Sequence, residues 1–477
     1  MFLMDANGRG ASELEELLKK ALDEITVLKT ENARLKQENA ELREALAIKN
    51  MNSSNSSKPP SSDIVKPPRE QRKKGKRKIG AQIGHKQHLR QPFENDQVDK
   101  IVRLTLEACP ECGMKMKIVK EGMKKHQQVE LVKKPFIVTE YEQCRYWCSH
   151  CQCYHEAKMP LEVRNAGLFG PNLISLTAYL KGRCHMSYQT MQSFFAEAFG
   201  LKVSTGFLTK QVYKASKALQ RAYDHLVEQL PEAEHLHSDE TGGNENGKSR
   251  WIWCFRGKDF TVFHIDPLRS SAVLEQLLGK DYAGIISSDF HSMYKKFKSI
   301  SNARLQLCWA HLIREVKFIA EQTDKEVSAW GIALLEEIHK MFSVYHCRGK
   351  LASGYYWVSK MRACKEKILT VALSRVPARK IAQSLSARFR DWQEEYFLFI
   401  DEDLPPTNNL CEQSIRSVVI DRKITQGTRS DWGNRWSERI WTVLATCKQR
   451  DVNVLSFIRS CVGAFLQGFS PPLLIVK

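Results

Sequence analysis

Long apolar runs are missing from this 477-residue chain. No stretch approaches the ~20 apolar residues that a membrane-spanning helix needs. The opening MFLMDANGRG also has no apolar segment followed by a small-residue cleavage site, so we expect neither membrane insertion nor secretion. Acidic residues are scarce too, with 54 Asp and Glu against 73 Lys and Arg. The net charge of +19 favours polyanionic partners, nucleic acid first, with simple solubility as the alternative.

The chain is too large to need disulfide staples, and its 14 cysteines suit a reducing cytosol. Four of them form two C-x-x-C pairs, Cys109 with Cys112 and Cys148 with Cys151. Each pair can wrap one face of a tetrahedral ion, and Gly113 permits a close turn. We therefore predict a structural zinc ion in a zinc-ribbon-like module at 99–160. Other residues that could complete the second pair are Cys144, His150, Cys153 and His155.

The N-terminal part is predicted to be a coiled coil followed by a linker. Apolar residues recur with heptad spacing over 12–49, with Asn32 and Asn39 on the same stripe, so we expect a coil that pairs protomers. A single amphipathic helix packed on its own domain is the alternative. Residues 50–98 form a Ser/Pro-rich and basic linker, disordered alone and able to lie along phosphates or simply to be solvated. Its candidate DNA contacts are Lys73, Lys74, Lys76, Arg77 and Lys78.

A helical DNA-binding region is predicted at 165–230. Its three helices should span Pro171–Gly182, Ser187–Ala198 and Ser204–Leu219, because Pro171 suits a first helical turn and both serines are good N-caps. The short connection after the second helix resembles helix-turn-helix spacing. Any three-helix core would give a similar pattern, so the DNA-binding assignment is one of two interpretations.

Over 231–325 the spacing of apolar residues changes from the helical period to the alternation that is typical of strands. Predicted strands are Glu234–Asp239, Arg250–Phe255, Phe260–Ile265, Ala283–Asp289 and Leu305–Cys308, with helices at Leu268–Leu278 and from Trp309 to about Glu321. Three antiparallel strands, a helix and another strand open a ribonuclease H-like fold. We therefore predict a multidomain α/β protein with a ribonuclease H-like catalytic core, interrupted by a helical insertion at 326–400 and closed by helices at 401–477.

Three acidic residues are candidates for a metal site in this core. Asp239 and Asp289 end strands that are neighbours in that topology, and clustered carboxylates repel one another unless hard cations such as Mg²⁺ or Mn²⁺ bridge them. Two such ions can activate the attacking oxygen and steady the leaving oxygen of a phosphodiester. Glu412 is the third candidate, although Asn409 as an N-cap would make it part of a capping box instead. Arg416 lies one turn further along, placed to meet Glu412 or a phosphate.

These features together resemble the transposases of the insertion-sequence 66 family. The likeness runs through Ser56–Asp63 (SSKPPSSD), the paired C-x-x-C module, Ser238–Gly242 (SDETG), Asp289 with Tyr294, Cys308–Arg314 (CWAHLIR), Asn408–Glu412 (NNLCE), Arg416 and Arg422-Lys423. The basic segment from Gly80 departs from it, reading Gly-Ala-Gln-Ile-Gly-His where a Gly-Gly-Gln-Pro-Gly-His pattern is expected.

The resemblance implies a DDE transposase that cuts and joins DNA. It places the catalytic triad on Asp239, Asp289 and Glu412, puts His311 and Arg314 near the site, and makes Arg416, Arg422 and Lys423 candidates for phosphate contacts. The implied partners are the element's terminal inverted repeats, target DNA, other copies of the chain through the N-terminal coil, and accessory proteins of the same element. The expected location is the bacterial cytoplasm, at the nucleoid. A zinc-containing DNA-binding regulator and a structure-specific nuclease are the alternatives.

Overall fold

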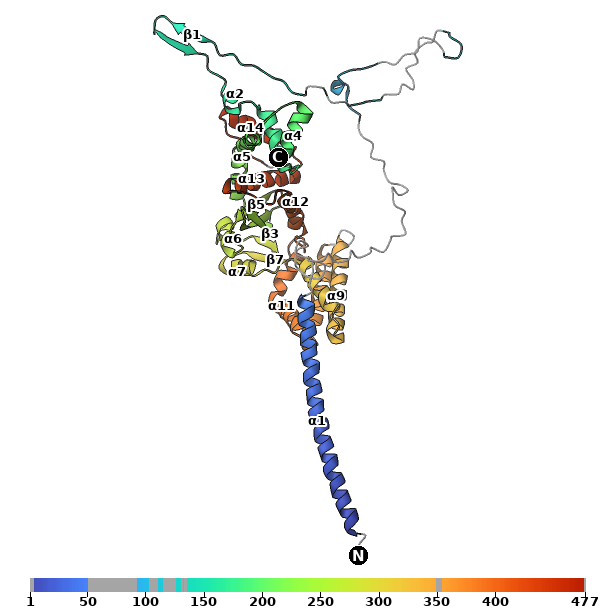
Figure 1. Cartoon of the computed structure of the whole chain (residues 1–477). Coiled ribbons are helices and arrows are strands. Elements are labelled where there is room, and N and C mark those ends of the chain that lie inside the picture. The colour runs from blue at the N-terminus through green and yellow to red at the C-terminus, as the bar shows by residue number, and fades with distance from the viewer. Residues whose placement is uncertain are drawn as a thin grey trace.

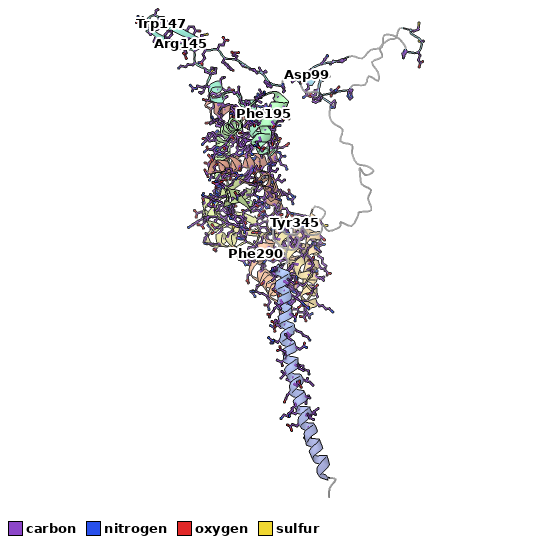
Figure 2. The ribbon with its side chains drawn as sticks, in the orientation of Figure 1. Asp99, Arg145, Trp147, Phe195, Phe290 and Tyr345 are labelled. Atoms are coloured by element: carbon purple, nitrogen blue, oxygen red, sulfur yellow. The ribbon has the colours of Figure 1, made fainter. Side chains whose placement is uncertain are left out.

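The computed structural model describes residues 4–49, 92–102, 110–114, 126–129, 132, 135–348 and 354–475. Figure 1 shows an elongated molecule, with helix α1 (Met4–Lys49) extending from one end of the body and a hairpin of β1 (Arg145–Cys148) and β2 (Cys153–Glu156) at the other. Arg145 and Trp147 are labelled on this hairpin in Figure 2. None of the helices in the described ranges combines the length and apolar character needed to span a bilayer.

A five-stranded sheet lies at the centre of the body. Its strands are β3 (His235–Glu245), β4 (Lys248–Arg256), β5 (Thr261–Asp266), β6 (Ile285–Ser288) and β7 (Arg304–Leu307). They are hydrogen-bonded in the order β5-β4-β3-β6-β7. The β3–β4 and β4–β5 pairs are antiparallel, whereas β6 is parallel to β3 and β7 is parallel to β6. All five predicted strands are thereby confirmed.

Strand β3 is longer than the predicted strand ending at Asp239. The sequence GGNENGK predicts a turn over Gly242–Lys248, and this prediction is wrong over most of its length, because β3 continues to Glu245 and pairs with β4 from His237 onward. The reversal is confined to Asn246 and Gly247, both with positive φ (48° and 86°). A two-residue hairpin of that kind needs left-handed backbone at both positions, which the Asn-Gly pair supplies, so the two glycines before it remain in the strand.

Helix α13 (Asp431–Gln449) covers the outer strand of the sheet. The Glu438 carboxylate and the Thr442 and Thr446 hydroxyls, one helical turn apart, accept the backbone N–H groups of Ile265, Phe263 and Thr261 at 2.7–3.1 Å. These bonds satisfy the exposed edge of β5, which would otherwise present unpaired donors. The polar face of α13 therefore closes one side of the sheet.

The predicted helices before the sheet are confirmed as α3 (Pro171–Gly182), α4 (Tyr188–Phe199) and α5 (Thr205–Glu228), preceded by α2 (Leu161–Ala166). Ser187 and Ser204 cap α4 and α5 through their side chains, as expected. Helix α5 runs on past the predicted Leu219, because its apolar stripe stays buried as far as Leu226. These helices and the C-terminal α14 (Val454–Gln467) share one hydrophobic core with the sheet.

A second hydrophobic core belongs to the helices that follow β7. They are α8 (Trp309–Ala320), α9 (Lys325–His346), α10 (Gly354–Leu373) and α11 (Lys380–Phe397), joined by a 3₁₀ turn (Leu398–Ile400) to the chain leading into α12 (Asn409–Thr425). The helical character predicted for 326–400 is confirmed over the residues of this range that the structure describes. Helices α6 (Ser271–Leu278) and α7 (Ser292–Ile300) connect β5 to β6 and β6 to β7.

Helix α1 meets this second group of helices near its C-terminal end, where the Glu44 carboxylate accepts the backbone N–H of Ile381 at 3.0 Å. Where the structure describes the side chains of α1, apolar residues of the predicted stripe are open, since Leu28 and Leu42 are 60% and 64% exposed. The helix predicted at 12–49 is confirmed, and its pairing with another protomer stays a prediction.

Candidate active site

The strand register brings Asp239 and Asp289 to the same edge of the sheet. Parallel pairing of His237 with Ser287 means that Asp239 and Asp289, each two residues further on, continue in matching positions. Asp289 follows directly after β6, and its carboxylate accepts the backbone N–H of His291 at 3.0 Å. Asp239 accepts the backbone N–H of Glu240 at 2.9 Å. The two aspartates thus come from neighbouring strands, as predicted.

Asn408 attaches the start of α12 to the residues before Asp239. Its side-chain amide donates to the Ser238 carbonyl at 2.7 Å, and its carbonyl oxygen lies 3.1 Å from His237 Nδ1. Its backbone N–H donates to Cys308 Sγ at 3.1 Å. The prediction that Asn409 is the N-cap is wrong: Asn408 occupies that position and its side chain makes no capping bond. The capping-box interpretation of Glu412 therefore fails, because the tertiary contacts of Asn408 take the place of a cap.

Glu412 lies in the first turn of α12, facing α8. His311 Nδ1 and an Arg314 guanidinium nitrogen each lie 3.8 Å from Glu412 Oε1. Both residues were expected near the site, and the structure places them beside Glu412. Arg416 is exposed one turn further along α12. The recorded ion-pair partners of Glu412 in the described chain thus come from α8 and not from its own helix.

Electrostatics link the three acidic residues. Burial, followed by the negative charges of Glu240, Asp289 and Glu412, raises the pKa of Asp239 well above its usual value. Burial and the charge of Arg314 lower the pKa of His311, which favours the neutral imidazole. Carboxylates that repel one another in a partly enclosed site are suited to hold a hard divalent cation, which would offset the repulsion.

Glu240 is a site residue that the sequence analysis missed. Its carboxylate is buried and pairs with an Arg269 guanidinium nitrogen at 2.6 Å. It also accepts a hydrogen bond from Tyr294 at 2.8 Å. Burial and the charge of Asp289 raise the pKa of Glu240, whereas Arg269 opposes that shift. The adjacent Asp-Glu in SDETG was the available signal. We infer that Glu240 supports the site through Arg269 and Tyr294.

Basic residues line a cavity of about 530 Å³ beyond the far end of α12. Its cationic lining residues are Lys181, Arg250, Arg422 and Arg429, against one carboxylate, Asp421. Arg422 also donates to the Thr241 hydroxyl on β3 at 3.0 Å, which ties this cavity to the strand that carries Asp239. Lys423 is exposed nearby. The predicted contacts Lys73, Lys74, Lys76, Arg77 and Lys78 lie outside the described residues.

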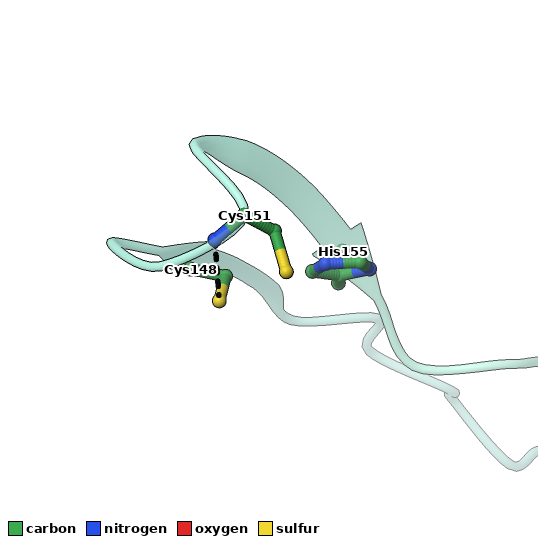
Figure 3. A group of neighbouring side chains, drawn as sticks. All are labelled: Cys148, Cys151 and His155. Atoms are coloured by element: carbon green, nitrogen blue, oxygen red, sulfur yellow. Dashed lines mark hydrogen bonds between the residues drawn. The ribbon is translucent and has the colours of Figure 1, made fainter.

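A second group of ligand-type side chains lies on the β1–β2 hairpin. Cys148 Sγ, Cys151 Sγ and a His155 ring nitrogen are all within 4.8 Å of one another (Figure 3). Hydrogen bonds from the backbone N–H groups of Cys151 and His150 lower the pKa of Cys148. The structure thus brings together the second predicted pair with one of its alternatives, His155. Cys112 is exposed in a separate described segment, and Cys109 lies outside the described residues.

Comparison with known proteins places these residues in a family. Residues 166–435 match the Transposase IS66 family, and residues 9–91 match a family of unknown function (DUF6444). Two uncharacterized proteins of Sinorhizobium fredii (strain NBRC 101917 / NGR234) are similar. The chain is 21% identical to y4hP over an alignment that covers 77% of the chain and 72% of y4hP. It is 24% identical to y4qI over an alignment that covers 66% of the chain and 63% of y4qI.

The matched range contains Asp239, Asp289 and Glu412 together with His311 and Arg314. It covers more than half of the chain. This protein belongs to the IS66 family of transposases.

Proposed function

We propose that the protein binds the ends of an insertion sequence and catalyses DNA cleavage and strand transfer by a DDE mechanism. The observation that carries this proposal is the convergence of Asp239, Asp289 and Glu412, whose charges act on one another from two neighbouring strands and a helix. Such a cluster of carboxylates suits metal-dependent phosphodiester chemistry. The match to a transposase family supplies DNA as the substrate class.

A ribonuclease H-like core is the fold that we propose for this site. Its support is the strand order β5-β4-β3-β6-β7, with three antiparallel strands on one side and two strands parallel to β3 on the other. Helix α6 lies between β5 and β6 in the chain, as that topology requires. The helices of the second core then form an insertion between β7 and α12.

Asp239, Asp289 and Glu412 would hold two Mg²⁺ or Mn²⁺ ions, which when bound stabilise charge on phosphate oxygens and lower the pKa of the attacking hydroxyl. Their fit to such ions rests on burial and on the mutual repulsion of the carboxylates, which together raise the pKa of Asp239. In the proposed reaction, water attacks the phosphodiester at the element's end and releases a 3′-OH. That 3′-OH then attacks a target phosphodiester and displaces the 3′ oxygen of the target strand, which leaves as a new 3′-OH. Arg314, beside Glu412, would contact a non-bridging oxygen of the phosphate.

DNA beyond the cleaved bond would follow the basic cavity at the far end of α12. Arg422 on α12 and Arg429 beyond its end would supply charge for the phosphate backbone without reading sequence, as would Arg416 and Lys423, which are exposed on α12. The helical region that includes α3 to α5, the hairpin and the basic linker would recognise the ends. Helix α1, with its open apolar stripe, would pair protomers so that two ends are held together.

A strand-transfer assay tests this function. The wild type, incubated with Mg²⁺ and a labelled duplex that carries the element's end, is expected to cut at the end and to join it to target DNA. Asp289→Asn and Glu412→Gln are expected to bind the same duplex without cutting, and Asp281→Asn, an exposed aspartate, serves as the matched control. Cutting by the triad variants at the wild-type rate would refute the assignment. Cutting without end preference would favour a structure-specific nuclease, and binding without cutting would favour a regulator.

We also propose that the hairpin holds one structural Zn²⁺ through Cys148, Cys151 and His155, completed by a cysteine of the first C-x-x-C pair. The full chain should then contain about one zinc per protomer, and Cys148→Ser should retain less than about a tenth of it, because a tetrahedral thiolate site rarely survives loss of a ligand. Metal analysis after dialysis measures this, with exposed Cys184→Ser as the control. Full zinc content in Cys148→Ser would contradict the proposal.

A further inference from the structure

Two buried ligand-type atoms face each other at Glu412 without hydrogen-bond partners among the described residues. They are His311 Nδ1 and Glu412 Oε1, and 3.8 Å separates them. Cys308 Sγ lies within 4.8 Å of both residues' ligand atoms. Buried polar atoms in folded proteins are nearly always bonded, and an exception calls for an explanation such as an ion that sits between them.

The separation fits two donors of one metal ion better than it fits a hydrogen bond. A nitrogen–oxygen hydrogen bond is usually ~2.7–3.2 Å long. Two donor atoms that each lie ~2.1 Å from a common ion are about 3–4 Å apart, depending on the angle between them. The distance of 3.8 Å between His311 Nδ1 and Glu412 Oε1 falls in the second range.

Backbone contacts hold the three residues in place without help from this pair. Cys308 precedes α8, and the Trp309 N–H donates to the Pro406 carbonyl at 3.0 Å, just before the start of α12. The Asn408 N–H donates to Cys308 Sγ at 3.1 Å. These two bonds join the beginnings of the helices that carry His311 and Glu412. The fold therefore presents the two donors to each other as a prearranged pair.

We propose that His311 is a nitrogen ligand of the divalent ion that Glu412 holds, with Cys308 as a third donor. This inference rests on the proposed function, in which Glu412 binds a catalytic metal ion. An imidazole and a sulfur are poor ligands for Mg²⁺, which prefers oxygen, so of the two ions proposed above this donor set favours Mn²⁺. The metal site would therefore have hard oxygen ligands from the aspartates and softer nitrogen and sulfur ligands from His311 and Cys308.

The alternative is that His311 only positions Glu412 through its charge or packing. A positioning residue would affect the affinity of the site, but it would place no nitrogen on the metal ion. Pulsed electron paramagnetic resonance of bound Mn²⁺ separates the two roles, because a directly coordinated imidazole nitrogen modulates the echo decay of the manganese signal. The measurement needs neither DNA nor turnover, so it reports on the metal site alone.

The full-length protein with Mn²⁺ is expected to show nitrogen modulation, which His311→Gln abolishes and His291→Gln retains. His291 is the matched control, because it also lies beside a triad residue but directs its ring to the N–H of Met293. His311→Gln should weaken Mn²⁺ binding at least tenfold, because the loss of a direct ligand should cost no less than the loss of an outer-shell group. Cys308→Ser should leave the modulation in place and reduce the displacement of Mn²⁺ by thiophilic Cd²⁺ at least tenfold.

Two results would overturn the proposal: a wild-type spectrum without nitrogen modulation, or modulation that persists in His311→Gln. Unchanged Cd²⁺ displacement in Cys308→Ser would remove the thiol from the donor set. Failure of the proposed function would look different. In that case Asp239→Asn and Glu412→Gln would bind Mn²⁺ as the wild type does, because the carboxylates would not be its ligands. The wild-type spectrum remains informative even if a variant does not fold.

Discussion

Asp239→Asn is expected to abolish DNA cleavage and at the same time to stabilise the metal-free protein. Loss of one carboxylate that holds a catalytic ion removes several kcal/mol of transition-state stabilisation, which corresponds to ~10³-fold or more in rate. The same change removes a charge that Glu240, Asp289 and Glu412 repel. Activity and stability should therefore move in opposite directions, which is typical of a residue retained for function.

The stability effect has a definite dependence on pH. Since folding raises the pKa of Asp239 above its unfolded value, the folded state binds the proton more tightly, and the free energy of unfolding falls as the pH rises through and above the usual range for aspartate. In EDTA at pH 8, Asp239→Asn should gain ~1–3 kcal/mol over the wild type. Below about pH 4 the gain should vanish, because the carboxyl is then protonated in both states.

Urea unfolding with EDTA at pH 8 and near pH 4 measures this difference, and the same experiment with Mg²⁺ should raise the stability of the wild type but not that of the variant. Asp281→Asn, at an exposed position, should change neither quantity. A wild type that is as stable as Asp239→Asn at pH 8 without metal would show that the three carboxylates do not repel one another. The proposed site would then lose its main physical support.

Trp309→Ala is expected to lower the free energy of unfolding by ~3–5 kcal/mol, which is the usual cost of removing a fully buried tryptophan. Trp309 is completely buried and begins α8. Its ring contacts those of Phe342, Phe389, Tyr396 and Phe397 at centroid distances of 5.1–6.3 Å. Its indole N–H also donates to the Tyr396 carbonyl. The cavity left by alanine would therefore open in the middle of the second core.

Trp309→Ala should also weaken Mn²⁺ binding at the proposed active site, because Trp309 adjoins Cys308 and precedes His311 and Arg314 on one helix. Trp309→Phe, which keeps an aromatic ring, should lower the free energy of unfolding by less than half as much as Trp309→Ala. Tyr355→Ala, at a residue that is 87% exposed, should leave the free energy of unfolding almost unchanged. Urea unfolding and Mn²⁺ affinity are measured side by side. A drop in stability without any loss of Mn²⁺ affinity would show that the second core does not position α8 at the site.

The secondary structure and the pair of aspartates were predictable because their signals are local. Strand alternation and the Asn-Gly turn residues lie within short windows, and Asp239 and Asp289 are recognisable as strand ends. The length of β3 was misjudged because the glycines before Asn246 were taken for the turn. Glu240 was missed because its neighbour Asp239 already filled the role of a strand-end acid.

Other features depend on contacts between distant parts of the chain. From the sequence alone, the polar face of α13 would be expected to face solvent. In the structure, its Thr442 and Thr446 hydroxyls accept hydrogen bonds from the edge of β5. Asn408 reads as a residue beside a helix cap, and its side chain instead bonds to the strand that carries Asp239. Such pairings follow from tertiary packing, which local propensity does not encode.

The insertion of the second core between β7 and α12 has a consequence for synthesis of the protein in a living cell. In the proposed triad, Asp289 and Glu412 are 123 positions apart, so at ~5–20 residues per second a ribosome needs roughly 6–25 s to pass from one to the other. During that interval the nascent chain has its two aspartates but no third carboxylate. On this assignment, a truncated or stalled polypeptide that ends before Glu412 would lack the complete triad and would not cut DNA.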